Sequence, residues 1–246
     1  MKPLASLTIV VLAYNEQESL PRVVEETRRA GADVAEKLEV IVVDDGSTDC
    51  TASIADSLAH ESGGVVRALH HKKNLGIGAA ETTGYRAARH EYITFFPADG
   101  QIPASSLTGM AAIAPQCDIV ITKYRKRDSL RRRLLSMLWR DVLVGLMFGR
   151  VVMADGNYIF RRRLLDRLIV PVNTQAFHIG FFVRARMAGL KMRSVVIDCL
   201  PRLHGHSKVA STRSVVKILE DMRQVRNALA EIRRRSRRGE GFEEMR

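Results

Sequence analysis

The sequence predicts an α/β fold with a mostly parallel central sheet and flanking helices. Short apolar runs rich in β-branched residues recur along the first half of the chain, and a segment of helical composition follows most of them. Continuous apolar runs are typical of parallel strands buried on both faces, and their alternation with helices indicates a layered α/β sheet. A chain of 246 residues that is 46% hydrophobic can bury such a core.

The first two predicted strands are Leu7–Leu12 and Leu38–Val43, which read LTIVVL and LEVIVV. A helix is expected between them over Ser19–Ala30, where Pro21 is acceptable in a first turn. Three shorter runs predict further strands at Val65–Leu69, Tyr92–Phe96 and Asp118–Thr122. Helices are expected after the second and third strands, at about Thr51–His60 and Ile77–Ala88.

The charge divides the chain into two halves. Residues 1–122 carry 10 basic and 16 acidic side chains, whereas residues 123–246 carry 29 basic and 11 acidic ones. The overall charge of +12 is therefore a net −6 followed by a net +18. We predict a single catalytic domain over residues 1–235 with halves 1–122 and 123–235, and a flexible tail at 236–246.

The basic half has its own pattern. The basic run Lys123–Arg133 directly precedes the segment Leu134–Phe148, which is rich in large apolar residues. A further strand is expected at Val195–Asp198, and an amphipathic basic helix from Val215 to about Arg235. A basic run before an apolar helix is the arrangement that an anionic membrane surface attracts, although a solvated charged face is the commoner origin of such a run.

Several classes of protein are disfavoured. The three cysteines are far apart, which argues against a disulfide framework or a zinc site. The longest apolar runs, Leu7–Ala13 and Val142–Phe148, are much shorter than the roughly 18 residues of a spanning helix. Aromatic residues are few and form no stacking pattern among the basic runs, so we expect no nucleic-acid partner.

Polar residues follow four predicted strands, and ligands in parallel sheets bind outside the carboxyl ends of the strands. Each residue taken singly is more often a turn former or helix cap. Four such loops at one edge nevertheless favour a binding site. The residues are Tyr14, Asn15 and Glu16, then Asp44 and Asp45, then Asn74, and finally Asp99.

In order along the chain, these motifs resemble the family 2, A-type, inverting glycosyltransferases. The resemblance is closer to the polyprenyl-phosphate sugar transferases, the group of dolichol-phosphate mannose synthase and its bacterial relatives. It spans about residues 7–208, and each motif is weak alone whereas the ordered set is specific. The motifs begin at residues 13–16, 42–49, 74–78 and 97–101 and continue at Arg125, 132–136, 155–156 and 202–208.

The resemblance implies a nucleotide-sugar pocket and a divalent cation. The pocket would be lined by Tyr14, Asn15, Glu16, Asp44, Asp45, Asn74, Gly76 and Ala98. Mg²⁺ or Mn²⁺ would neutralise the leaving diphosphate, and Asp99 and Gln101 match the family's metal positions. Pro97 stands where most relatives have an earlier acid. His204 is either a further ligand or an ordinary surface residue.

The resemblance also implies a phosphate acceptor. Arg125, Arg132 and Ser136 would hold the lipid phosphate, with Arg133 a close alternative to Arg132. Arg202, Ser207 and Lys208 would close over the phosphates as a flexible loop. Arginine suits this task because its guanidinium engages phosphate through two hydrogen bonds.

A hydroxyl acceptor would instead need a general base. Many relatives have a glutamate where Gly180 stands, and no acidic residue occurs between Asp166 and Asp198. This gap disfavours a carboxylate base from the segment and leaves His178, or an acid from elsewhere, as candidates.

The predicted protein is therefore an inverting, metal-dependent hexosyltransferase bound peripherally at the cytoplasmic face of a membrane. It would transfer a sugar from a nucleoside-diphosphate sugar to a polyprenyl phosphate. Since no carboxyl-terminal spanning helix follows, we expect any membrane partner protein to be separate. One alternative is transfer to a hydroxyl of a glycan, protein or small molecule. Another is a catalytically silent sugar-nucleotide-binding or scaffold protein, which Pro97 and Gly180 leave open.

Overall fold

The computed structural model describes residues 2–125, 144–170, 176–201, 203 and 212–237, with side chains of the last segment described over 219–234. The chain forms two compact units. Unit 1 comprises Met1–Lys126, Ala154–Arg163 and Leu190–His206, and unit 2 comprises Arg127–Met153, Leu164–Gly189 and Ser207–Arg246. The division at residue 122 and the tail from residue 236 remain predictions.

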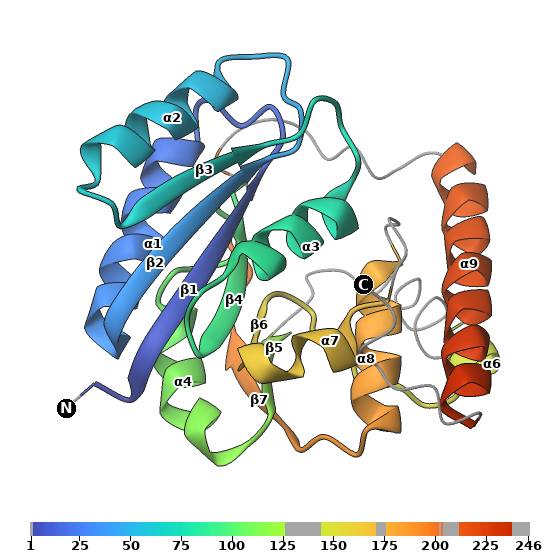
Figure 1. The fold of residues 1–246 in the computed structure, drawn as a ribbon. Coiled ribbons are helices and arrows are strands. Elements are labelled where there is room, and N and C mark those ends of the chain that lie inside the picture. Colours follow the sequence, from blue (N-terminus) through green and yellow to red (C-terminus); the bar gives the residue numbers. More distant parts are fainter. Residues whose placement is uncertain (1, 126–143, 171–175, 202, 204–211, 238–246) are drawn as a thin grey trace. The chain divides into compact units, whose positions relative to one another are not determined.

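Unit 1 is built on a seven-stranded sheet with the order β3-β2-β1-β4-β6-β5-β7 (Figure 1). All neighbouring strands are parallel except β6, which runs antiparallel to both β4 and β5. The predicted α/β fold with a mostly parallel sheet is therefore confirmed. The strands are β1 (Leu4–Ala13), β2 (Ala35–Asp44), β3 (Val66–His70), β4 (Tyr92–Pro97), β5 (Ile119–Tyr124), β6 (Tyr158–Arg161) and β7 (Met192–Ile197).

Helices cover both faces of this sheet. They are α1 (Leu20–Val34), α2 (Thr51–Glu61), α3 (Ile77–Ala87) and α4 (Ser106–Ile113), with a 3₁₀ turn at Ala114–Gln116. Alternation along β1 sets the two faces. Ile9 packs at Gly31 of α1, whereas Val10 packs at Gly84 of α3, where an added Cβ would lie 2.3 Å from Val10 Cγ1.

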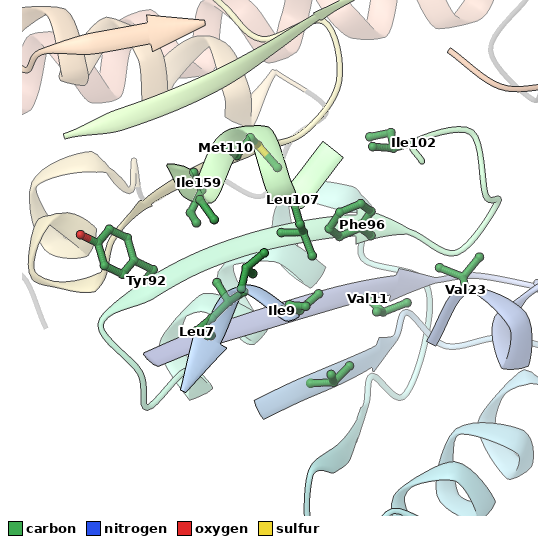
Figure 2. Packing of buried hydrophobic residues seen from close by; sticks show 14 of the residues in the cluster. Leu7, Ile9, Val11, Val23, Tyr92, Phe96, Ile102, Leu107, Met110 and Ile159 are labelled. Carbon is green, nitrogen blue, oxygen red and sulfur yellow. The ribbon is translucent and has the colours of Figure 1, made fainter. Parts of the chain in front are cut away.

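The main core of unit 1 lies on the α1 and α4 side of the sheet. Figure 2 shows side chains of β1 and β4 together with Leu107 and Met110 of α4 and Val23 of α1. Leu7, Ile9, Val11 and Phe96 are all 0% exposed. Residues of these central strands are also buried on the α3 side, as their unbroken apolar sequences predict.

All six predicted strands begin and end within three residues of the observed ones, and the three predicted helices of unit 1 form. The strand predicted at Val195–Asp198 overlaps only the second half of β7. Strand β6 and helix α4 were not predicted.

Unit 2 is helical in its described parts. Its helices are α6 (Gly145–Phe148), α7 (Leu165–Leu168), α8 (Phe177–Met187) and α9 (Thr212–Arg237), and a 3₁₀ turn at Arg162–Leu164 leads into α7. A buried cluster joins residues of α6, α8 and α9, among them Phe148, Val183 and Val225. The predicted basic helix is thus confirmed as α9. In the described parts of the chain, no helix is long and apolar enough to cross a membrane.

Candidate functional site

The predicted pocket residues meet at one edge of the unit 1 sheet. Strands β1 to β4 are mutually parallel, so their carboxyl ends share an edge. Tyr14 follows β1, Asp45 follows β2, and Ala98 and Asp99 follow β4. Backbone bonds hold the loops in register, because Asp45 N–H donates to the Ala13 carbonyl and Ala98 N–H to the Leu12 carbonyl, both at 2.9 Å.

The β1 and β2 loops are joined through Asn15, the one described non-glycine residue with a positive φ, 54°. Its backbone N–H donates to Ser47 Oγ at 2.9 Å, and its Oδ1 accepts from Thr48 N–H at 2.8 Å. Glu16 begins the turn into α1, where its Oε2 accepts from Ser19 Oγ at 2.8 Å. Both residues therefore hold the loops at this edge of the sheet in place.

Asp44 joins β2 to β3. Its Oδ1 accepts from Ser47 N–H at 3.1 Å, and its Oδ2 lies 3.2 Å from His70 Nδ1. His70 Nε2 lies 3.0 Å from Asp56 of α2. Burial lowers the pKa of His70, but its hydrogen bonds to Asp56 and Asp44 raise it more, so the net shift is upward. The neighbouring carboxylates thus favour the protonated imidazole.

Asp45 organises the loop after β3 and is 4% exposed. Its Oδ1 accepts from Leu75 N–H at 2.9 Å and lies 2.7 Å from His71 Nδ1, while its Oδ2 accepts from Gly76 N–H at 2.8 Å. A carboxylate offers about four acceptor positions. Three are used within the protein, which leaves about one for a ligand and fixes the first turn of α3.

The remaining predicted pocket residues differ in exposure. Tyr14 is half-buried and Asn74 is exposed, whereas Ala98 is 1% exposed and its methyl belongs to the core. Glycine is required at position 46, because φ is +68° and an added Cβ would lie 2.3 Å from the carbonyl carbon of Lys73. This close approach brings the loops after β2 and β3 together.

The turn after β4 carries the candidate metal ligands. Asp99 is 7% exposed, and its Oδ1 accepts from Gln101 N–H at 3.1 Å. Gly100 has φ +73°, and an added Cβ would lie 2.5 Å from Leu203 Cδ1. Leu203 N–H donates to the Asp99 carbonyl and Leu200 N–H to that of Gln101, at 3.1 and 2.9 Å. The segment that follows β7, at Leu200 and Leu203, therefore holds this turn in place.

This turn offers hard oxygen donors two residues apart, a carboxylate and an amide, which fit Mg²⁺ or Mn²⁺. Pro97, the last residue of β4, offers no ligand in its side chain. Within the described ranges, no group of three or more His, Cys, Asp or Glu side chains is arranged to hold a metal ion. A cation at Asp99 and Gln101 would complete its shell with water and substrate oxygens, as Mg²⁺ commonly does.

Asp155 and Tyr124 stand at the same edge and were not predicted as site residues. Asp155 N–H donates to the Thr122 carbonyl at 2.9 Å, and Tyr124 N–H donates to Asp155 Oδ2 at 3.3 Å. Burial raises the pKa of the Tyr124 phenol, and the neighbouring Cys199 thiol and the carboxylates of Asp99 and Asp155 raise it further. The phenol is therefore a neutral hydrogen-bonding group near the carboxylates of Asp99 and Asp155.

Of the predicted acceptor residues, Arg125 lies in the described part of unit 1. Its backbone N–H donates to the Ile197 carbonyl at 2.8 Å, and its Nε lies 3.2 Å from Asp198 Oδ1. Both side chains are about two-thirds exposed, 65% and 69%. The others lie outside the described residues: Arg132, Arg133, Ser136, Arg202, Ser207 and Lys208. His204, the possible further metal ligand, also lies outside them.

In unit 2, Gly180 lies inside α8 against two valines. An added Cβ would lie 2.7 Å from Val170 Cγ2 and 3.3 Å from Val225 Cγ1. A glutamate at this position would have to displace core side chains. His178, the alternative base, lies two residues earlier in the same helix, about half a turn away, and is half-buried.

The family model of "Glycosyl transferase family 2" matches residues 8–181. An undecaprenyl-phosphate 4-deoxy-4-formamido-L-arabinose transferase of Pseudomonas fluorescens is 29% identical over 221 residues, covering 87% of this chain and 62% of that protein. A transferase of the same name from Serratia proteamaculans is 27% identical over 227 residues, covering 90% and 68%. The chain thus spans about three fifths of the length of the first of these relatives.

Solved structures of glucosyl-3-phosphoglycerate synthase from Mycobacterium tuberculosis have a similar fold. One, in complex with Mn²⁺, UDP and glucosyl-3-phosphoglycerate, has a TM-score of 0.61 at 20% identity and covers 92% of this chain and 79% of that one. Another, with Mg²⁺ and UDP, has a TM-score of 0.60 at 19% identity, covering 89% and 79%. From the sheet, its loops and the matched residues, the chain belongs to glycosyl transferase family 2 and has the A-type glycosyltransferase fold.

Proposed function

We propose that this family 2 glycosyltransferase moves a hexose from a nucleoside-diphosphate sugar to a polyprenyl phosphate, with inversion of the anomeric centre. The observation that carries the proposal is the similarity to undecaprenyl-phosphate sugar transferases over 87% of the chain. The packing around Gly180 supports it, because a phosphate acceptor is the kind that can dispense with a carboxylate base at that position.

The chemistry of the acceptor explains why. A phosphate monoester has a second pKa of about 6, so near neutrality its oxygen is already largely anionic. In the proposed step, this oxygen forms a bond to the anomeric carbon while the bond from that carbon to the diphosphate oxygen breaks. The products are a polyprenyl-phosphate sugar and a nucleoside diphosphate, and no proton has to be removed from the nucleophile.

The edge of the unit 1 sheet would bind the donor. The loops of Asn15, Asp45 and Gly76 would surround the nucleoside, since they converge there through the contacts described above. Asp99 and Gln101 would hold Mg²⁺ or Mn²⁺, which when bound neutralises charge on the leaving diphosphate. The solved synthases with Mn²⁺ or Mg²⁺ and UDP support this assignment by their fold.

The acceptor phosphate would be held by arginines, namely Arg125 together with Arg132 or Arg133, and by Ser136. Arg202, Ser207 and Lys208 would close over the phosphates. An exposed ion pair such as Arg125–Asp198 contributes only about 0–1 kcal/mol. A dianionic phosphate could therefore replace Asp198 on the Arg125 guanidinium at small cost. The lipid substrate would position the protein peripherally at the cytoplasmic face of a membrane, where a separate membrane protein could assist it.

The test is transfer by the purified chain to a short polyprenyl phosphate, with a set of uridine, guanosine and thymidine diphosphate sugars and Mg²⁺ or Mn²⁺. The matching polyprenol without phosphate serves as the hydroxyl control. We expect a lipid-linked sugar from the phosphate alone. Transfer to the alcohol but not to the phosphate would overturn the proposal.

Two carboxylate variants sharpen the assay. Asp99→Asn should abolish metal-dependent turnover. Asp118→Asn, which alters a carboxylate at the opposite edge of the sheet that accepts from Lys191 N–H, should leave it nearly unchanged. If the chain binds nucleotide but transfers no sugar, and Asp99→Asn does not change that binding, the protein is instead a catalytically silent binding protein. A strong loss of transfer activity in His178→Ala, together with an Arg132→Ala variant that stays active, would indicate a hydroxyl acceptor.

A further inference from the structure

Helix α9 separates its exposed charges by sign. Successive helical residues are about 100° apart, so positions three, four or seven apart share a side. One exposed side, here named the arginine face, consists of Leu219, Arg223, Arg226, Ala230, Arg233 and Arg234. Of the described acids, Asp221 is buried, and Glu220 and Glu231 flank one edge of the face, three residues before Arg223 and Arg234.

An adjoining side of α9 is fixed in the core of unit 2. Met222 and Val225 are 0% exposed, and both belong to the buried cluster that also contains Val144 and Phe148 around α6. Between these two, Leu146 is 80% exposed, the most exposed of the large apolar side chains described. An exposed leucine therefore lies on α6, a helix whose buried residues pack in the same cluster as those of α9.

The arginines are largely available to a partner. Arg234 Nη2 lies 3.6 Å from Glu231 at the edge of the face, and both side chains are substantially exposed. For Arg223, Arg226 and Arg233, no ion pair occurs with any side chain in the described ranges. Three guanidinium groups in a row without acids between them make a surface that attracts anions.

We propose that the arginine face of α9, with Leu146, is the surface through which unit 2 binds an anionic lipid bilayer. The choice of a bilayer rests on the proposed lipid acceptor. It also rests on Leu146 and Leu219, which is 41% exposed, because apolar side chains gain by entering the boundary between headgroups and acyl chains. The phosphates of a nucleic acid would interact with the arginines but would make no use of the exposed leucines. The helix lies on the membrane plane and does not cross it.

The test is flotation of the full chain with vesicles of 30% phosphatidylglycerol and 70% phosphatidylcholine, without polyprenyl phosphate or donor. We expect the chain to bind these anionic vesicles and to bind pure phosphatidylcholine only weakly. Binding to the anionic vesicles should be lost in 0.5 M salt, because salt screens the attraction to charged headgroups. Each basic residue near an anionic surface contributes about fivefold in affinity. The triple variant R223Q/R226Q/R233Q should therefore bind on the order of 100-fold more weakly.

A matched control variant removes three positive charges from unit 1 instead of from α9. Arg22, Arg86 and Arg89 are exposed residues of unit 1, and the variant R22Q/R86Q/R89Q should bind within about threefold of the parent. Leu146→Ser should weaken binding about tenfold, with little change in its salt dependence. Unfolding midpoints close to that of the parent show that all variants fold, since every substituted side chain is exposed.

Equal losses in the two triple variants, or no preference for phosphatidylglycerol, would overturn the proposal. Tighter binding to a single-stranded oligonucleotide than to these vesicles, lost in the α9 triple variant, would assign the face to nucleic acid instead. The outcome is independent of catalysis, because the vesicles contain no acceptor. A protein that docks but transfers no sugar would refute the proposed function and retain this surface.

Discussion

Replacing Gly180 by alanine tests whether position 180 has room for any side chain. Alanine is favoured over glycine inside a helix by about 1 kcal/mol, so in free space the change would stabilise the protein. Here the added methyl would lie 2.7 Å from Val170 Cγ2 and 3.3 Å from Val225 Cγ1. Overpacking of this kind costs about 1–3 kcal/mol. We therefore expect Gly180→Ala to lower the free energy of unfolding by about 1 kcal/mol.

Urea unfolding followed by circular dichroism measures this change. Gly145→Ala in α6 is the matched control within unit 2, because nothing lies within 4 Å of its added Cβ, and it should be neutral or stabilising. In a double-mutant cycle, Val170→Ala should relieve the crowding of Gly180→Ala and give a favourable coupling of about 1 kcal/mol. Gly180→Glu adds a buried carboxylate to the crowding and should cost more than about 4 kcal/mol.

A result in which Gly180→Ala stabilises the protein as much as Gly145→Ala would refute this reasoning. Position 180 would then be open to a side chain. The loss of a carboxylate there would have to be explained by acceptor chemistry alone.

Three further predictions concern stability. Gly46→Ala should cost more than about 3 kcal/mol in urea unfolding, because its positive φ and the neighbouring loop backbone both oppose a side chain; a loss below 1 kcal/mol would contradict this. His70 has a raised pKa, so its pairs with Asp56 and Asp44 stabilise the fold fully below its unfolded value of about 6.5 and lose effect as pH rises through the folded value. The urea concentration at the unfolding midpoint should decrease as the pH rises from 6 to 8.5, and His70→Gln should make this midpoint less dependent on pH. Arg184 is 4% exposed and donates hydrogen bonds to two carbonyls at 2.8 and 3.3 Å. Replacing it by methionine should lower the free energy of unfolding by about 2 kcal/mol. An unchanged thermal unfolding midpoint would show that these bonds contribute little.

Long apolar runs made the central strands predictable, whereas β6 and α4 gave weaker signals. Strand β6 has four residues, and its last one, Arg161, is charged, so it lacks the length of a typical strand. Helix α4 begins at Ser106 without a side-chain cap and contains Gly109 and the two alanines Ala111 and Ala112. Such a segment gives little periodicity, and its helix forms because Leu107 and Met110 are buried in the core.

The candidate site was predictable to the extent that it depends on strand ends. Asp44, Asp45 and Asp99 follow apolar runs, and parallel strands bring their carboxyl ends to one edge. His70 and His71 were missed because their role depends on β3 lying beside β2, which local sequence does not reveal. Asp155 was missed as a site residue for a similar reason, since its place at the edge depends on the reversed direction of β6.

The reversed strand β6 also determines the edge at which the chain leaves and re-enters the sheet. Because β6 runs against its neighbours, the segment 127–153 leaves the sheet after β5 and returns to the same edge, where Asp155 N–H meets the Thr122 carbonyl. The cost of closing such a loop grows by only about 0.6 kcal/mol for each doubling of its length. Insertions, deletions or wholesale exchange within this segment would therefore burden the sheet little. Evolution can therefore replace what lies between the two anchors while the edge formed by the ends of β1 to β4 stays intact.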